Sequence, residues 1–152
     1  MFKSCTNFNA NLKNWELNKD VKFLNDMFYE CENFTGKGLE NWDVSNIIDM
    51  TGMFFKCKQF NIDLSNWDVH NVQKTKFMFS NCEKFKGEGL SNWNFLENNI
   101  KNISFMFYKC NKFKEDLSNW NISENFKPFN MRHMFDDCNS LRIIPNWFKT
   151  DN

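Results

Sequence analysis

Apolar positions along the chain follow two alternating spacings. From Val44 to Phe60 they recur at intervals of three or four residues, which is typical of short α or 3₁₀ turns with one face directed inward. After Phe60 the spacing changes, because Ile62 and Leu64 are separated by a polar residue and Trp67 follows. That alternation is typical of a short strand. The pattern predicts a turn segment followed by one strand.

This pattern is repeated along the chain. The string Met-Phe-x-x-Cys-x-x-Phe, with Leu as its last residue in the sixth copy, recurs every 25 to 28 residues, beginning at Met1, Met27, Met53, Met78, Met106 and Met134. An Asn-Trp pair follows each copy, and all six Cys and all six Trp lie in the repeat. A unit of this length cannot bury a core alone, whereas stacked units can. We therefore predict that residues 1–152 form a single domain. Its fold class is an α/β repeat solenoid of six coils, each with one short parallel strand and one short α or 3₁₀ turn.

Two of the units are one residue longer between Phe and Leu, and both carry glycine pairs. The pairs are Gly36 with Gly38 and Gly87 with Gly89. Glycine tolerates positive φ and close backbone approach, so these residues are interpreted as structural, absorbing the extra residue before the strand.

One unit carries a resemblance to a known family. The run from Phe60 to Val69, Phe-Asn-Ile-Asp-Leu-Ser-Asn-Trp-Asp-Val, and the run from Asp116 to Trp120 resemble the roughly 26-residue surface-protein repeat of Mycoplasma and Listeria lipoproteins, which is related to BspA-like leucine-rich repeats. The resemblance implies a leucine-rich-repeat-like solenoid that serves adhesion or protein binding, without catalysis in the repeats.

The cysteines and histidines do not suggest catalytic or metal chemistry. Each Cys occupies the same place in its unit, between Met-Phe and an apolar residue, so we expect a column of buried free thiols rather than disulfides. Spacings of the type Cys-x-x-Cys or Cys-x-x-His are absent, and we expect no metal site and no cofactor. His133 lies five residues before Cys138, a poor spacing for a nucleophile and its base, so we expect no enzyme activity and assign no catalytic residue.

The Asn-Trp pair suggests two structural columns. An amide side chain donates and accepts, so the Asn residues are expected to form a buried ladder between coils, with an exposed polar stripe as the alternative. The ladder comprises Asn14, Asn41, Asn66, Asn92, Asn119 and Asn146. We expect the Trp side chains to pack in the core with each indole N–H on a polar partner, in preference to an exposed platform for sugars or bases.

Charge gives little indication of a partner. The chain has 19 basic and 19 acidic residues, so it lacks the overall charge of a dedicated nucleic-acid or membrane-surface binder. Lysines do recur near the Met-Phe-x-x-Cys turns, and we interpret them mainly as solvated surface, with an RNA-binding or acidic-protein-binding ridge as the alternative. Polar residues beside the predicted strand are the candidate binding residues: Asp63, Ser65, Ser91, Asp116 and Ser118.

The two ends of the predicted stack differ. Pro145 replaces the Ser before Asn-Trp and removes a ladder donor, so the C-terminal end is expected to be blunted. At the N-terminal end, Phe2, Cys5 and Phe8 are expected to be packed on one side only. We therefore expect contact with another chain, or with an upstream segment, at the N-terminal coil.

These observations favour a non-catalytic module for protein–protein interaction. The alternatives are a structural subunit of a larger assembly, such as a virion or cell-surface layer, and a nucleic-acid-associated protein that uses the lysine ridge. No apolar run approaches the ~20 residues of a spanning helix, and the first residues lack a signal sequence. We expect a protein partner, no membrane span and a cytoplasmic or other intracellular location, with surface display requiring an upstream segment.

Overall fold

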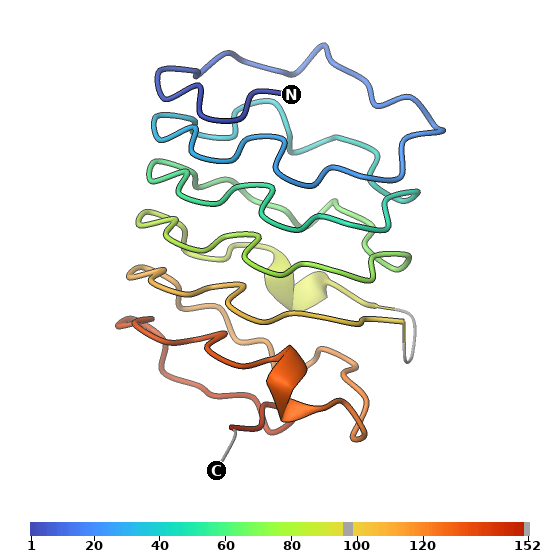
Figure 1. Ribbon diagram of the computed structural model, residues 1–152, viewed down its shortest axis with the longest axis vertical. Helices are drawn as coiled ribbons and strands as arrows, with labels where there is room; N and C mark the ends of the chain where they lie inside the picture. Colours follow the sequence, from blue (N-terminus) through green and yellow to red (C-terminus); the bar gives the residue numbers. More distant parts are fainter. Residues whose placement is uncertain (96–98, 151–152) are drawn as a thin grey trace.

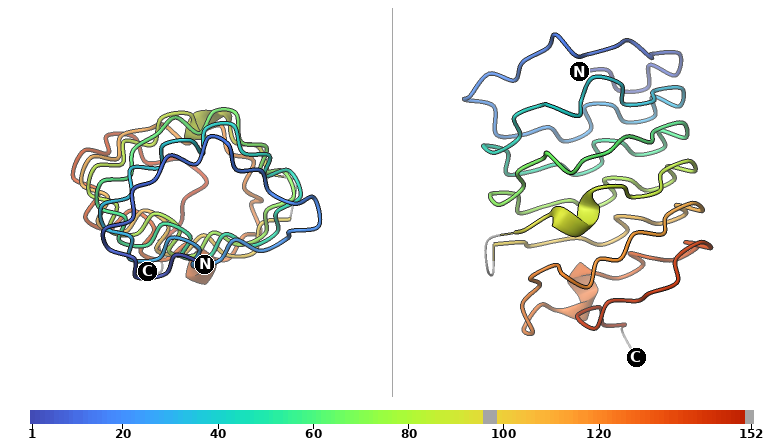
Figure 2. Two further views of the ribbon diagram at one scale, coloured as in Figure 1. Left: turned by 90° about the horizontal axis from the view of Figure 1, so that it is seen from above. Right: turned by 180° about the vertical axis from the view of Figure 1, so that it is seen from behind.

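The chain winds through successive coils that lie one above another, with its termini at opposite ends of the stack (Figure 1). Seen along the stack, the coils overlie one another with similar outlines (Figure 2). This computed structural model describes residues 1–95 and 99–150. The predicted domain, 1–152, also includes residues 96–98 and 151–152, which lie outside the described residues.

The predicted α/β class is wrong. In residues 1–95 and 99–150 the helices are two 3₁₀ turns, η1 (Leu90–Asn92) and η2 (Pro128–Asn130). Extended pairing in the same residues is limited to isolated parallel bridges, Phe23 to Asp49, Asp49 to Lys74 and Lys74 to Asn102. The leucine-rich-repeat-like solenoid, with a parallel strand and an α or 3₁₀ turn in every coil, is therefore not the architecture. The coils consist of turns and irregular backbone.

Left-handed residues explain why the three-to-four spacing does not produce helices. The residue before Cys has φ between 58° and 61° in all six units, and these residues are Ser4, Glu30, Lys56, Asn81, Lys109 and Asp137. The residue before Met is also left-handed in five units, with φ between 55° and 62°; these are Asp26, Gly52, Phe77, Phe105 and His133. A right-handed helix requires consecutive residues at negative φ, so each helical segment ends within one turn.

The backbone hydrogen bonds also reflect these short turns. Cys57 N donates to Phe54 O at 2.9 Å, and Trp67 N donates to Leu64 O at 3.1 Å, and each bond closes a local four-residue turn. Alternate amides point to the next coil, as Phe54 N does to Met78 O at 2.9 Å. Because many N–H groups close local turns, few remain to build a continuous strand ladder.

The core is a column of stacked phenyl rings. The Phe after each repeat Met stacks on its counterpart in the next coil, with ring centroids 5.5 to 5.9 Å apart; these are Phe2, Phe28, Phe54, Phe79, Phe107 and Phe135. That separation exceeds the ~4.8 Å between paired strands. A second Phe packs 4.1 to 4.4 Å from the first in five coils. Flat rings in register join the coils.

The thiols form a second column. Cys31 and the four cysteines after it are buried, and each donates its S–H to a phenylalanine carbonyl of the preceding coil at 2.9 to 3.1 Å. Burial raises the pKa of Cys31 to about 11 and that of Cys138 to about 12. The expectation of buried free thiols is confirmed for these five, whereas Cys5 is exposed.

Indoles form a third column along the Asn-Trp positions. Trp67, Trp93, Trp120 and Trp147 stack with centroids 5.9 to 6.3 Å apart. Each of the four donates its Nε1–H to a carbonyl in the preceding coil, as Trp67 does to Leu39 O at 2.8 Å. Core packing is thus confirmed for the indoles from Trp42 to Trp120, while Trp147 is half-buried and Trp15 is 45% exposed.

Candidate interaction surfaces

A lateral row of half-buried rings, which we call the aromatic column, crosses four coils. It comprises Tyr29, Phe55, Phe77 and Phe105. Their successive ring centroids lie 4.5, 6.1 and 4.7 Å apart. The first two rings follow the repeat Met by two residues and the last two precede it. The left-handed turns bring these different sequence positions into one row.

Cationic side chains cover the aromatic column. Lys3 Nζ lies 4.4 Å from the centroid of Tyr29, and Arg132 Cζ lies 5.8 Å from that of Phe105. Lysines lie at 5.1 to 5.3 Å from the two rings between them. Such contacts contribute about 0.5–1 kcal/mol each at exposed sites and hold the cations beside the rings.

Acidic residues of neighbouring coils pair with part of the predicted lysine ridge. Lys3 Nζ lies 3.0 Å from Asp26 Oδ2, and Lys56 Nζ lies 2.7 Å from Glu30 Oε1. The hydrogen bond from Lys56 lowers the pKa of the Glu30 carboxyl. A third pair joins the next lysine to a glutamate at 2.9 Å. The lateral face therefore has mixed charge rather than a continuous basic stripe.

The predicted binding residues lie on another part of the coils and serve their own turns. Asp63 Oδ1 accepts the Ser65 amide at 2.8 Å. Asp116 Oδ1 accepts both the Ser118 amide at 2.9 Å and its hydroxyl at 2.6 Å, which lowers the pKa of that carboxyl. Ser91 lies within η1 and is half-buried, while the other four are exposed. Binding at these residues stays a prediction.

The asparagine ladder is exposed, not buried. Asn14, Asn41, Asn66, Asn92, Asn119 and Asn146 all carry exposed side chains. Within the described part of the chain, one bond joins two of them, from Asn66 Nδ2 to Asn41 Oδ1 at 3.4 Å. The expectation of burial is wrong because the adjacent indole N–H groups, rather than these amides, reach the carbonyls of the preceding coil.

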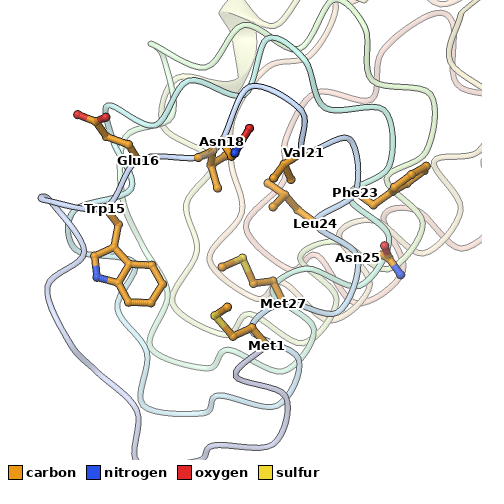
Figure 3. A pocket seen from close by; sticks show the side chains of 10 residues that line it. Met1, Trp15, Glu16, Asn18, Val21, Phe23, Leu24, Asn25 and Met27 are labelled. Carbon is orange, nitrogen blue, oxygen red and sulfur yellow. The ribbon is translucent and has the colours of Figure 1, made fainter.

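At the N-terminal end the apolar interior opens to the surface. A hollow of about 320 Å³ lies between Met1, Trp15 and the segment from Val21 to Met27. Figure 3 shows Trp15, Met1 and Met27 around it, with Phe23 pointing outward at the rim. Met1 is 85% exposed and Phe23 is 64% exposed. As predicted, this coil is packed on one side only.

At the C-terminal end, the residues after the last coil cover part of it. Phe148 packs edge-on against Phe135 at 5.0 Å between centroids, and Lys149 N lies 3.0 Å from Met131 Sδ. Pro145 is buried, and Phe135 is only 9% exposed. Ile143 and Ile144 remain 50% and 56% exposed at this end. The edge strand that Pro145 was expected to blunt is absent from the described residues, so the predicted reason for a blunted end is wrong.

Titratable clusters are sparse. His70 Nδ1 lies 2.5 Å from Asp68 Oδ1, which lowers the pKa of Asp68, and His133 Nδ1 lies 2.7 Å from Asp136 Oδ2. Both histidines are substantially exposed. In residues 1–95 and 99–150, no three Cys, His, Asp or Glu side chains are grouped as a metal site would require. Across the same ranges, no helix has the length and apolar character needed to cross a membrane.

Sequence reasoning did not identify the aromatic column. The usable signal was an aromatic residue next to the Met-Phe pair, on either side of it, in four consecutive units. Aligning the units on Met-Phe-x-x-Cys superposes the inward-facing residues. The outward rings then fall at different positions, after the pair in two units and before it in the other two.

Comparison with known sequences gives a family. The sequence model of one family, described as Mycoplasma protein of unknown function, DUF285, matches residues 1–99 and again residues 22–148. No curated protein and no solved structure matches the chain. The Mycoplasma part of the resemblance seen in the sequence is thereby confirmed. Because the match from residue 1 to residue 99 alone spans more than half of the 152 residues, the chain belongs to the family described as Mycoplasma protein of unknown function, DUF285.

Proposed function

We propose that the chain is a non-catalytic repeat module that binds another protein through the aromatic column. The observation that carries the proposal is the unbroken row of half-buried rings from Tyr29 to Phe105, flanked by Lys and Arg. Aromatic residues and arginine are enriched in protein interfaces, and the aromatic side chains supply large contact areas at small entropic cost. The resemblance to BspA-like surface repeats, which implies protein binding, supports the same role.

The chemistry of this face favours a protein over a nucleic acid. The rings stack in two pairs, the pairs meet edge to face, and Lys or Arg lies over ring faces, so few faces are open to intercalating bases. Ion pairs such as Lys56–Glu30 place carboxylates among the lysines, where they would repel phosphates. A protein surface with both signs of charge and an apolar strip is the complementary partner.

The test compares captured proteins for matched variants. The whole chain, immobilised, would be exposed to extract from its native source, and the captured protein would then be purified and titrated. We expect saturable binding that Phe55→Ser with Phe77→Ser weakens by at least tenfold. Ser65→Lys, at a candidate residue away from the column, is the matched control and should leave affinity within twofold. Thermal unfolding of each variant would verify that the fold is retained.

Two outcomes would overturn the proposal. One is binding lost in Ser65→Lys and retained in the column variant, because the polar residues predicted from the sequence would then carry recognition. The other is capture of RNA or DNA whose binding is strongly salt-dependent. A steep linear fall of log affinity with log salt concentration would indicate phosphate contacts.

A further inference from the structure

Two successive interior coils carry the same Lys-Phe-Lys triplet at the same place in the repeat. The triplets are Lys84-Phe85-Lys86 and Lys112-Phe113-Lys114. Both phenylalanines are fully buried, whereas all four lysines are exposed. Each coil therefore presents two lysines to solvent, one on either side of an inward-facing ring. We call these four residues the lysine grid.

The two triplets lie against each other across the boundary between their coils. The ring centroids of Phe85 and Phe113 are 6.3 Å apart, and Lys114 N donates to Lys86 O at 3.1 Å. Residues of like charge therefore lie in register between the coils. Like charges at directly opposed positions are destabilising, so the lysine grid opposes the association of the two coils that carry it.

The two coils before the triplets show the opposite arrangement, because charges in register there have opposite sign. Lys58 Nζ, for example, lies 2.9 Å from Glu32 Oε2 of the preceding coil. Within residues 1–95 and 99–150, Lys86 is the only member of the lysine grid with an ion pair, at 3.7 Å to Glu88. The grid is thus a local excess of positive charge in a chain whose 19 basic and 19 acidic residues balance. Such a concentration of one sign of charge attracts an anionic ligand.

A polar hollow borders the lysine grid. Lys114 lines it together with Asn139, Ser140 and Arg142 of the next coil, and its volume is about 600 Å³. Arg142 follows the Met-Phe-x-x-Cys-x-x-Leu string of its unit as Lys114 follows the string of the unit before, so a third coil continues the cationic column. Cationic and amide donors around one hollow are suited to carboxylate oxygens.

We propose that the lysine grid binds an extended acidic segment of another protein, which runs along the stack with carboxylates at alternate residues. In an extended chain, side chains two residues apart point to one face and lie about 6.6–6.8 Å apart. This spacing is close to the 6.3 Å between Phe85 and Phe113, so successive carboxylates meet lysines of successive coils. The site goes beyond the proposed function, because it includes no residue of the aromatic column.

The surroundings of the lysine grid favour an acidic polypeptide over a nucleic acid. Phe85 and Phe113 have no exposed surface, so bases find no ring to stack on between the lysines. Exposed carboxylates also flank the grid along the chain, with Glu83 on one side and Glu88 and Asp116 on the other. A duplex is wider than one extended segment and would bring further phosphates towards these carboxylates, whereas a single segment fits between them.

Fluorescence anisotropy with labelled peptides and the whole chain at low salt tests the proposal. The probe is a peptide of four Glu-Ser repeats, and its match is a peptide of the same composition with the four Glu contiguous. We expect saturable one-to-one binding of the alternating peptide, at least threefold tighter than binding of the contiguous one. Lys86→Gln with Lys114→Gln should weaken it at least fivefold. Lys19→Gln with Lys101→Gln removes the same charge at exposed lysines elsewhere and should change affinity less than twofold.

Four results would each overturn the proposal. They are absence of saturable binding, equal affinity for the two peptides, equal weakening by the two lysine pairs, and tighter binding of an oligothymidylate through the same lysines. Thermal unfolding of each variant would verify the fold. Phe55→Ser with Phe77→Ser should bind the acidic peptide as the unmodified chain does, so this test and the test of the aromatic column can fail separately.

Discussion

The indole column allows a matched test of what the side-chain N–H groups contribute to stability. Trp67 and Trp42 are equally buried, at 3% and 4% exposed, and occupy equivalent positions in successive coils. Trp67 Nε1 donates to Leu39 O at 2.8 Å, whereas Trp42 Nε1 is buried without a partner in the described part of the chain. Replacing each by Phe removes the same atoms but only one hydrogen bond.

The expected difference follows from the two environments. A hydrogen bond of this kind contributes about 0.5–1.5 kcal/mol net, and a buried unpaired donor costs about 1–3 kcal/mol. Trp67→Phe loses the bond, while Trp42→Phe removes the unpaired donor. Both rings are equally buried, so the cost of the smaller ring is similar, and the stacking that Trp67 alone has on Trp93 adds to the difference in the same direction. Trp67→Phe should therefore reduce the free energy of unfolding by about 2 kcal/mol more than Trp42→Phe.

Urea unfolding followed by circular dichroism is the appropriate assay, because both changes alter tryptophan fluorescence. With a denaturant dependence of about 2 kcal/mol per molar urea, the two midpoints should differ by about 1 M. Equal midpoints at equal slopes would refute the reasoning, and so would a lower midpoint for Trp42→Phe. Either result would mean that the carbonyl contacts of the indoles do not stabilise the stack.

Four further outcomes follow from the core. A thiol reagent at pH 8 should label Cys5 rapidly and the five buried thiols only after denaturation; labelling of several thiols in the native protein would contradict their burial. Thiol ionisation should not affect the free energy of unfolding below the pKa of an unfolded thiol, about 8.5. As pH rises towards the folded pKa of about 11 at Cys31, the unfolded thiol ionises first and the free energy of unfolding should fall. Cys31→Ala should therefore show a smaller fall in urea midpoint between about pH 8.5 and 10.5. Phe54→Ala, at a side chain with no exposed surface, should reduce the free energy of unfolding by about 3–5 kcal/mol, and Phe129→Ala, at an exposed ring, by under about 1 kcal/mol in the same urea assay. Gly36→Ala should lower the thermal midpoint, because Gly36 has a φ of +91° and an added Cβ would lie 2.6 Å from a ring carbon of the next coil; an unchanged midpoint would show that the turn can adjust.

The sequence predicted which residues face the core, because the same positions are buried in successive units. The Phe of Met53-Phe54 and the thiol of Cys57 are inward-facing in every interior unit, so six copies average out local variation. The local backbone could not be predicted in the same way. The left-handed position before Cys holds Glu30 and Lys56 in successive units, residues that ordinarily favour helices, and only the bonds between coils hold them at positive φ.

Surface features were less predictable for a related reason. Asn precedes Trp in all six units, and this recurrence predicts a buried side chain. The Asn66 side chain nevertheless faces solvent. Phe55 and Phe77 occupy different positions of their units and still meet side by side. A repeat in sequence predicts contacts between equivalent positions, whereas the lateral row arises from inequivalent ones.

The stacked indoles also make the stack its own optical reporter. Four near-parallel indoles separated by 5.9 to 6.3 Å are close enough for their electronic transitions to couple. Their combined near-ultraviolet dichroism depends on adjacent coils remaining in register, and it ends when neighbouring rings separate. The signal therefore follows the order between coils, and it distinguishes loss of one coil at an end from simultaneous loss of all coils.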